Sequence, residues 1–143
     1  MDLSVVIPLY NESESIEELN NWITKTLYSA RITFEIIYID DGSSDGSWDI
    51  IKRLANNSDN IKGISFSKNF GKSQALNAGF IESKGNFVAT LDADLQDSPE
   101  EIPEMINKIK KENLDLISGW KKKRYDSLII KKIPSKLFNF VAR

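Results

Sequence analysis

The sequence predicts an α/β fold, with a Rossmann-like, mostly parallel sheet and helices on both faces. Short apolar, β-branched runs alternate with amphipathic segments of about 10 to 15 residues, the pattern of parallel strands joined by crossover helices. Turn-forming and capping residues separate the two kinds of segment. Of the 143 residues, 41% are hydrophobic, which is enough to bury the core of one globular domain.

Five strands are predicted, each followed by polar residues. They cover residues 4–10, 34–39, 61–67, 86–91 and 114–120. Because crossovers in parallel sheets are right-handed, the carboxyl ends of the strands meet at one edge, where such sheets bind ligands. A functional site is therefore expected in the segments just after the strands, at residues 10–12, 40–44, 68–72, 92–97 and 120–124.

Helices are predicted between these strands. The first begins at a capping box of Ser15 and Glu18, and the fourth has Ser98 as its N-cap and Glu101 as its capping-box acid. The second has Trp48, Ile51 and Leu54 as its apolar face, and the third is expected at about residues 72–83.

The composition excludes several kinds of site. The chain has no Cys and no His, so a disulfide framework, a Cys/His zinc site, a thiol nucleophile and an imidazole base are all ruled out. A metal would have to be a hard cation with oxygen ligands. With 19 basic and 21 acidic residues, the net charge of −2 gives no general attraction for nucleic acid.

Asp92 and Asp94 form the clearest candidate site. At a strand end, residues two apart point the same way, and two close carboxylates repel unless a cation joins them. A divalent cation is the natural partner, and Gln96 adds a neutral oxygen nearby. The alternative is simple surface charge at the start of the next helix. That explains Asp97 and Glu100, but Asp92 and Asp94 lie too far before the helix for this role.

Two further loops carry candidate residues. Asp40 ends the second strand, where a carboxylate can accept hydrogen bonds from a nucleobase or ribose, whereas Asp41 begins an ordinary turn. Lys68 and Lys72 flank a glycine turn, which suits either phosphate binding or a solvated loop. Neither the GxGxxG nor the GxxxxGK[ST] motif is present, which argues against a dinucleotide cofactor and a P-loop ATPase.

The chain changes character near its end. Residues 1–120 form the predicted core, and residues 121–143 form a basic segment and the start of an amphipathic helix. The cations at residues 121–124 follow the fifth strand, so they can hold phosphates at the acidic edge. The helix has no evident end before Arg143, so we expect the chain to be part of a longer protein.

Four motifs, in this order and spacing, resemble the nucleotide-sugar-binding half of family 2 glycosyltransferases with the GT-A fold. They are "VVIPLYNE", "DDGSSDGS", "KNFGKSQALNAG" and "DADLQDSPEE". The similarity is closest to polyprenyl-phosphate glycosyltransferases, such as dolichyl-phosphate mannose synthase and the bactoprenol glucosyltransferases. It covers essentially the whole chain, and four linked motifs are far more specific than any one of them.

This resemblance implies a role for each matching residue. Asp94, Gln96 and Asp92 would hold Mg²⁺ or Mn²⁺, and catalysis would rest on Asp92, Asp94 and Arg124. The donor nucleotide would be bound by Pro8, Tyr10, Glu12, Asp40, Asp41, Lys72, Asp92, Lys121 and Arg124. Lys121 stands where the family often has arginine, and a lysine cannot bind phosphate through two parallel hydrogen bonds as arginine does. Lys132 and Ser135 lie in a later stretch that matches the family less clearly.

The implied activity is an inverting, metal-dependent transfer of a hexose from a UDP- or GDP-sugar to a polyprenyl phosphate, for cell-surface glycan or glycolipid synthesis. The full-length protein would work at the cytoplasmic face of a membrane. This chain shows no signal peptide or transmembrane segment, so we expect it to be soluble itself. We expect it to bind a nucleotide but not to catalyse transfer unaided. The alternatives are a family 2 transferase that elongates a saccharide, and a non-catalytic nucleotide-binding domain.

Overall fold

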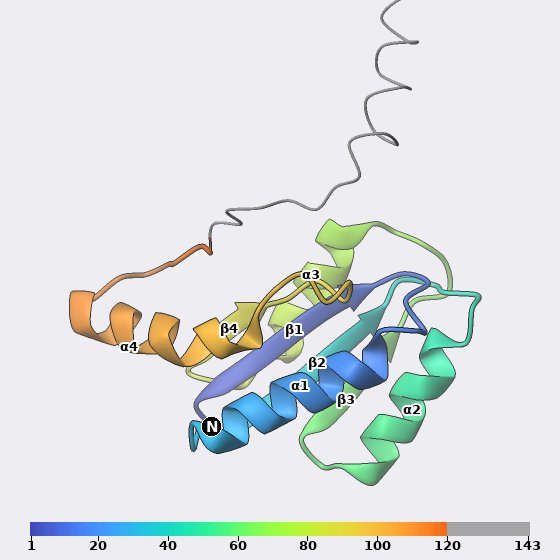
Figure 1. Ribbon diagram of the computed structural model, residues 1–143. Helices are drawn as coiled ribbons and strands as arrows, with labels where there is room; N and C mark the ends of the chain where they lie inside the picture. Colours follow the sequence, from blue (N-terminus) through green and yellow to red (C-terminus); the bar gives the residue numbers. More distant parts are fainter. Residues whose placement is uncertain (120–143) are drawn as a thin grey trace, which may run out of the picture.

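The computed structural model describes residues 1–119 and contains a sheet of four parallel strands (Figure 1). In chain order the strands are β1 (Leu3–Leu9), β2 (Phe34–Asp40), β3 (Ile61–Ser65) and β4 (Phe87–Thr90). Their order across the sheet is β3-β2-β1-β4, and Leu9 pairs with Asp40 at the carboxyl ends of β1 and β2. The first four predicted strands and their parallel arrangement are therefore confirmed.

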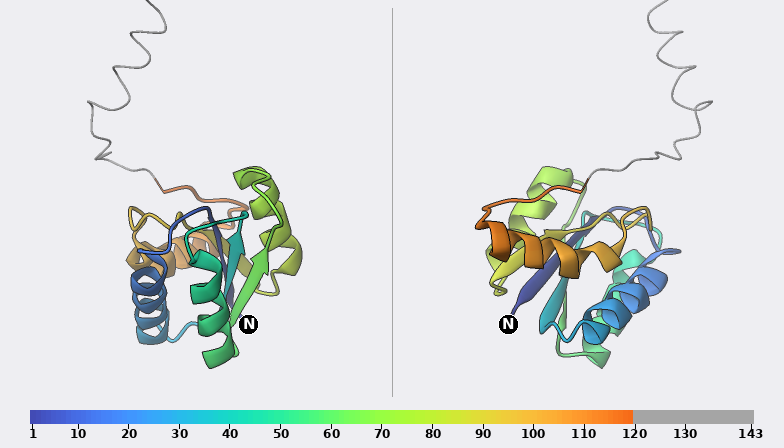
Figure 2. Two further views of the ribbon diagram at one scale, coloured as in Figure 1. Left: turned by 90° about the vertical axis from the view of Figure 1, so that its right-hand side faces the viewer. Right: turned by 60° about the vertical axis from the view of Figure 1, so that its left-hand side comes forward.

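Helices cover both faces of this sheet, as expected. Four helical segments are present in the described part of the chain: α1 (Ile16–Ser29), α2 (Ser47–Asn57), α3 (Lys72–Glu82), and α4 (Ile102–Glu112), which follows the short 3₁₀ helix η1 (Pro99–Glu101). Figure 2 shows α1, α2 and α4 on one side of the sheet and α3 on the other. A larger core forms under α1, α2 and α4, and a smaller one forms under α3.

The two central strands, β1 and β2, are buried along their whole length because a helix layer lies over each face. Leu3, Val5 and Ile7 face the larger core, and Val6 faces α3. On α3, a Cβ at Gly79 would lie 2.4 Å from Val6 Cγ1, so only glycine allows this close approach. Helix α3 is thus held tightly against the strands whose ends form the site.

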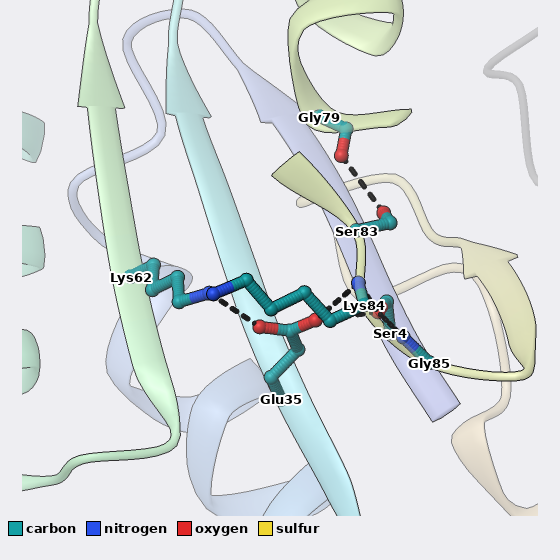
Figure 3. Close-up of polar contacts among 7 residues, drawn as sticks. All are labelled: Ser4, Glu35, Lys62, Gly79, Ser83, Lys84 and Gly85. Atoms are coloured by element: carbon teal, nitrogen blue, oxygen red, sulfur yellow. Dashed lines mark hydrogen bonds and ion pairs between the residues drawn. The ribbon is translucent and has the colours of Figure 1, made fainter. Parts of the chain in front are cut away.

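A buried polar cluster ties the opposite, amino-terminal edge of the sheet together (Figure 3). Glu35 on β2 is 2% exposed; it accepts hydrogen bonds from Ser4 Oγ at 2.7 Å and the Lys84 amide at 2.8 Å. Lys62 Nζ on β3 lies 2.7 Å from its other oxygen. Burial alone would raise the pKa of Glu35, but Lys62, Ser4 and Lys84 together lower it. Three strands and the turn before β4 are joined through this one carboxylate.

Two details of the predicted helix starts are wrong. Helices begin next to Ser15 and Ser98 as expected, but neither hydroxyl accepts a capping hydrogen bond. Ser15 already has helical dihedral angles, and its hydroxyl donates to the Glu12 carbonyl at 3.0 Å. The Ser98 hydroxyl donates to Glu100 at 2.9 Å. Both serines therefore fix the preceding loop or the first turn rather than cap the helix.

The predicted fifth strand is also wrong within the described residues. Residues 114–119 form no strand, and Leu116 is 82% exposed. A strand needs a neighbour to pair its backbone, and in the described part of the chain β4 pairs with β1 alone. Trp120 and the predicted basic segment and helix at 121–143, with Lys121, Arg124, Lys132 and Ser135, lie outside the described residues.

Candidate functional site

The carboxyl ends of β1, β2 and β4 surround a cavity of about 310 Å³. Its lining comes from the loops after these strands and from the amino-terminal turn of α3: Pro8, Leu9, Tyr10, Glu12, Asp41, Asn69, Gly71, Lys72, Ala75, Asp92, Ala93 and Asp94. Seven residues predicted from the sequence are thus brought together: Pro8, Tyr10, Glu12, Asp41, Lys72, Asp92 and Asp94. Asp40 and Gln96 do not line this cavity.

The loops after β1 and β2 are joined by hydrogen bonds that the sequence interpretation missed. The Asn11 amide donates to Ser43 Oγ at 2.8 Å, and the Ser44 amide donates to Asn11 Oδ1 at 2.9 Å. Asn11 adopts a left-handed backbone with φ of 56°, which asparagine tolerates better than most residues. The signal in the sequence was the run of serines after Asp41, which reads as an ordinary capping segment because its partners lie more than 30 residues away.

Asp45 completes this junction between the two loops. Its carboxylate accepts hydrogen bonds from the Ser13 amide at 2.9 Å and from the Ser47 amide at 3.0 Å. Burial would raise the pKa of Asp45, but the hydrogen bonds from Ser47 and Ser13 outweigh it and hold the pKa well below its usual range. A negative charge at the start of α2 therefore anchors the loop that carries Tyr10 and Glu12.

Glu12 lies among other carboxylates at the edge of the cavity. Its amide donates to Ser47 Oγ at 3.1 Å, which fixes its backbone. Burial and the negative charges of Asp94, Asp45 and Asp92 raise the pKa of its side chain. The cavity therefore holds more negative charge than its own cations neutralise, as expected for a site that receives a cation.

Asp40 and Asp41, adjacent in sequence, hold different parts of the site. Asp40 is 1% exposed and accepts hydrogen bonds from the Ser43 amide at 3.1 Å and from Ser65 Oγ at 3.2 Å. Asp41 is 4% exposed, and its two oxygens accept hydrogen bonds from the amides of Phe70 at 2.7 Å and Gly71 at 2.9 Å. Asp40 thus closes its own turn, whereas Asp41 fixes the loop that leads into α3.

Gly42 brings that loop close to the Asp41 turn. Its φ is +77°, and a Cβ at this position would lie 2.5 Å from the carbonyl carbon of Lys68. A side chain would therefore meet backbone that cannot move aside. Asp41 and Gly42 together hold residues 68–71 from two sides, and this places Lys72 at the start of α3 beside the cavity.

The acidic loop after β4 carries the predicted metal ligands. The Asp92 carboxylate pairs with Lys72 Nζ, and its amide donates to Asp97 Oδ2 at 2.9 Å. Asp94 is exposed and accepts a hydrogen bond from the Gln96 amide at 3.1 Å. Leu95 has a left-handed φ of 60° and packs against the larger core, which turns the chain sharply between Asp94 and Gln96.

These residues fit a divalent cation that shares its coordination with a ligand. Within residues 1–119, no group of three acidic side chains lies close enough to hold a metal unaided. Mg²⁺ is usually bound in proteins by one or two carboxylates together with substrate phosphates and water. Asp92 and Asp94 at the cavity wall supply two such carboxylates, so the donor set suits a metal–phosphate complex better than a metal alone.

Helix α1 supports the acidic loop from the other side. Trp22 Nε1 donates a hydrogen bond to Glu100 Oε1, and Ser98 Oγ donates to Glu100 Oε2 at 2.9 Å. These bonds, with that from Trp22 the stronger influence, lower the pKa of Glu100. The sequence predicted only that Glu100 adds negative charge at a helix start. Nothing in the sequence indicated its contact with Trp22, which lies 78 residues earlier.

None of the helices in residues 1–119 is long and apolar enough to cross a bilayer.

Curated relatives share this chain's sequence over nearly its whole length. A dodecaprenyl-phosphate galacturonate synthase from Rhizobium johnstonii is 34% identical over 142 residues, covering 99% of this chain and 42% of the relative. An undecaprenyl-phosphate 4-deoxy-4-formamido-L-arabinose transferase from Salmonella choleraesuis is 41% identical over 140 residues, covering 97% of this chain and again 42% of the relative. The chain therefore spans less than half the length of these curated relatives.

Solved structures share the fold. TarS 1–349 from S. aureus, in complex with UDP-GlcNAc, matches with a TM-score of 0.69 and 26% identity, covering 87% of this chain and 36% of that one. The mannosyltransferase PcManGT from Pyrobaculum calidifontis, in complex with GDP-Man and Mn²⁺, matches with a TM-score of 0.65 and 25% identity, covering 75% of this chain and 32% of that one.

The parallel sheet, the helices on both faces and these neighbours confirm the predicted α/β, GT-A fold. The family model for glycosyl transferase family 2 matches residues 4–140, nearly the whole chain. The resemblance identified from the four sequence motifs is thereby confirmed, and the chain belongs to glycosyl transferase family 2.

Proposed function

We propose that the protein is an inverting, metal-dependent glycosyltransferase that moves a hexose from a UDP- or GDP-sugar to a polyprenyl phosphate. The observation that carries this proposal is the gathering of Glu12, Lys72, Asp92 and Asp94 around one cavity at the carboxyl edge of the sheet. Ligands of open parallel sheets bind at this edge. Support for the acceptor comes from the relatives, which are named as a dodecaprenyl-phosphate galacturonate synthase and an undecaprenyl-phosphate 4-deoxy-4-formamido-L-arabinose transferase.

The cavity residues divide by chemistry. Pro8, Tyr10 and Asp41 lie at the ends of β1 and β2 and would line the nucleoside part of the donor. Asp92 and Asp94 would hold Mg²⁺ or Mn²⁺ against the donor phosphates, with Gln96 joining them if its exposed side chain turns inward. Asp40 is 1% exposed, already accepts hydrogen bonds from Ser43 and Ser65 and does not line the cavity, so geometry supports a contact with the base less than it supports the other roles.

The proposed reaction follows from where charge develops. As the bond between the sugar and the diphosphate breaks, negative charge grows on the departing nucleoside diphosphate. Lys72, placed at the cavity wall, neutralises part of that charge, and the proposed roles of Lys121 and Arg124 are the same. A divalent cation supplies further stabilisation of the leaving group when bound. An acceptor phosphate that attacks the anomeric carbon from the opposite side inverts its configuration and, already being an anion, needs no strong general base.

The rest of the cycle belongs to the whole protein. The relatives are more than twice as long as the part that this chain matches. We propose that the complete enzyme works at the cytoplasmic face of a membrane, where a polyprenyl phosphate is embedded, and that the product serves cell-surface glycan or glycolipid synthesis. The nucleotide-binding step should belong to the part described here.

Calorimetry with UDP and with GDP, each with and without Mn²⁺, tests the proposal on the 143-residue chain. Solved neighbours were captured with UDP-GlcNAc and with GDP-Man, so both nucleotides belong in the test. We expect one of them to bind, and to bind tighter when Mn²⁺ is present. If neither binds in either condition, the proposed function is wrong.

An Asp94→Asn variant separates the metal from the nucleotide. It keeps the size of the side chain and an oxygen that can accept from the Gln96 amide, but it removes the charge. We expect weaker nucleotide binding with Mn²⁺ and unchanged binding without it. An equal loss in both conditions would show that Asp94 contacts the nucleotide rather than the metal.

A further inference from the structure

Lys72 forms an ion pair with Asp92, one of the carboxylates that the proposed function assigns to the metal. It is the first residue of α3, and its ammonium pairs with Asp92 Oδ1, 20 residues further along the chain. Among the described residues that line the cavity, Glu12, Asp41, Asp92 and Asp94 are acidic and Lys72 alone is basic. An ammonium group and a divalent cation repel each other, so both cannot sit against the same carboxylate oxygen without a large cost.

The backbone beneath Lys72 is held in place, whereas its side chain is free to move. Asp41 binds the amides of the two preceding residues, Phe70 and Gly71, and Gly42 packs against the backbone of Lys68. The Lys72 side chain is 59% exposed and the Asp92 side chain 40%, so the ion pair is partly solvated and is weak in itself. A flexible four-carbon stem on a fixed base can move its charge from one anion to another nearby.

We propose that Lys72 is an exchangeable counter-ion: it neutralises Asp92 in the free protein and transfers to the donor diphosphate when the metal–nucleotide complex binds. This inference rests on the proposed function. Its consequence is that the cation and the nucleotide bind cooperatively. Without nucleotide, the cation must compete with Lys72 for Asp92; with nucleotide, the phosphates attract Lys72 away and supply the remaining ligands of the metal.

Cooperativity of this kind is reciprocal. If the nucleotide raises the affinity for Mn²⁺ by a given factor, Mn²⁺ raises the affinity for the nucleotide by the same factor. Part of that factor comes from the cation bridging Asp92 and the phosphates, which any metal–nucleotide site has. The part that comes from Lys72 should disappear when its charge is removed, which makes the two contributions separable by one substitution.

The test is to compare Lys72→Met with the unchanged 143-residue chain. Free Mn²⁺ is measured by electron paramagnetic resonance, first with protein alone and then with the nucleotide that the unchanged chain binds. Removing a partly exposed ion partner should tighten binding of Mn²⁺ alone by about two- to fivefold. Losing a charged contact to phosphate should weaken nucleotide binding in saturating Mn²⁺ by about tenfold or more. The two effects have opposite signs, so general damage to the site cannot mimic them.

Lys52→Met is the matched control. Lys52 is also an ion-paired, half-exposed lysine, with Asp49 at 2.7 Å on α2, and it does not line the cavity. This variant changes the net charge equally and should alter neither affinity. Lys72→Arg keeps the charge and should restore most of the cooperativity.

Three outcomes would overturn the inference. If Lys72→Met binds Mn²⁺ alone no tighter than the unchanged chain, Lys72 does not compete for Asp92. If Lys52→Met shifts Mn²⁺ binding equally, the effect is one of net charge. If the unchanged chain binds neither UDP nor GDP with Mn²⁺, the proposed function fails and the inference fails with it, whereas the first two results leave the proposed function intact.

Discussion

The indole Nε1 of Trp22 on α1 donates a hydrogen bond to the carboxylate of Glu100 in η1. This contact joins the first helix to the far end of the loop that begins with Asp92. The loop is thus fixed at both ends: at its start the Asp92 amide bonds to Asp97, and at its end Glu100 is held by Trp22 and Ser98. The position of Asp94 depends on both attachments.

Replacing Trp22 by Phe tests this support. The substitution keeps an aromatic ring but removes the pyrrole part of the indole with its N–H donor, so the free energy of unfolding should fall by about 1 kcal/mol or more. Mn²⁺-dependent nucleotide binding should weaken as well, because the acidic loop loses its support at Glu100. Denaturant titration and calorimetry measure the two effects. Tyr28→Phe, a polar-group deletion at an aromatic residue on the same helix that is 64% exposed, should change neither. Unaltered binding in Trp22→Phe would show that the loop holds its shape unaided.

Asp41→Asn tests the hold on the loop before α3. The asparagine side chain has one oxygen that accepts and one NH₂ group that donates. The backbone N–H of either Phe70 or Gly71 would therefore face the NH₂ group, another donor. Because Asp41 is buried, we expect a loss of about 2 kcal/mol in the free energy of unfolding. Nucleotide affinity should fall as Lys72 loses its fixed base. The control is Asp49→Asn, at an exposed, ion-paired carboxylate, where the change should stay within about 0.5 kcal/mol. Equal losses in the two variants would contradict the role given to Asp41.

Glu35→Gln tests the buried cluster at the amino-terminal edge. The pKa of Glu35 is lowered in the folded chain, so its carboxylate contributes stability above the unfolded pKa of about 4.5, and this contribution is lost as the pH falls through the folded pKa. At pH 7 the substitution should cost about 2 kcal/mol, because a charged hydrogen-bonding group loses its match to Lys62 and Ser4. The stability difference between the two proteins should shrink as the pH falls below about 4.

Glu17→Gln serves as the control for Glu35, because Glu17 forms an exposed ion pair with Arg53. Its cost should stay within about 1 kcal/mol. A difference between Glu35→Gln and the unchanged chain that stays constant from pH 7 to pH 3 would mean that the charge of Glu35 does not stabilise the fold.

Glu12→Gln should change the free energy of unfolding at pH 7 in the opposite direction to Glu35→Gln. The pKa of Glu12 is raised by burial and by Asp94, Asp45 and Asp92, so the folded chain holds its proton more tightly than the unfolded chain does. Stability is therefore lost as the pH rises from the unfolded pKa of about 4.5 through the folded pKa. The glutamine variant should be more stable at pH 7, by up to about 0.5 kcal/mol, with no gain at pH 4.

The same variant should bind the Mn²⁺–nucleotide complex less tightly, because it removes negative charge from the cavity. Glu14→Gln, two residues along and exposed, should show neither effect. Thermal unfolding at the two pH values and calorimetry provide both readouts. A stability loss at pH 7 would show that the Glu12 charge is already compensated in the folded chain.

The sequence predicted the layers of the fold because periodic apolar residues report burial directly. Strands β1 and β2 appear as short, mostly apolar runs that contain several β-branched residues, and helix α1 has its buried Ile16, Leu19, Ile23 and Leu27 at helical spacing. The run at residues 114–120 carries the same local signal, yet residues 114–119 form no strand. A strand also needs a paired neighbour, and local sequence does not report whether one is present.

The candidate site was predicted only in part for a related reason. The rule that parallel strands end at one edge correctly brought Glu12, Lys72, Asp92 and Asp94 together. It could not show which oxygens are already committed: Asp40 to Ser43 and Ser65, and Asp41 to the backbone before Lys72. Nor could it show that Asn11 bonds to the serine loop after β2. Such contacts join residues far apart in the chain, where no spacing rule applies.

Strand β1 is synthesised before the other three described strands but lies inside the sheet, between β2 and β4. Its residues Leu3 to Val6 pair with Phe87 to Thr90, so one flank of β1 stays unpaired until the chain has grown past β4. Contacts of such long sequence separation form late, because the intervening loop must close first. Pro8 and Leu9, which line one part of the cavity, are therefore synthesised well before Asp92 and Asp94, which line another part. Nucleotide binding should begin only when β4 has docked against β1, which makes the ligand itself a reporter of the closed four-stranded sheet.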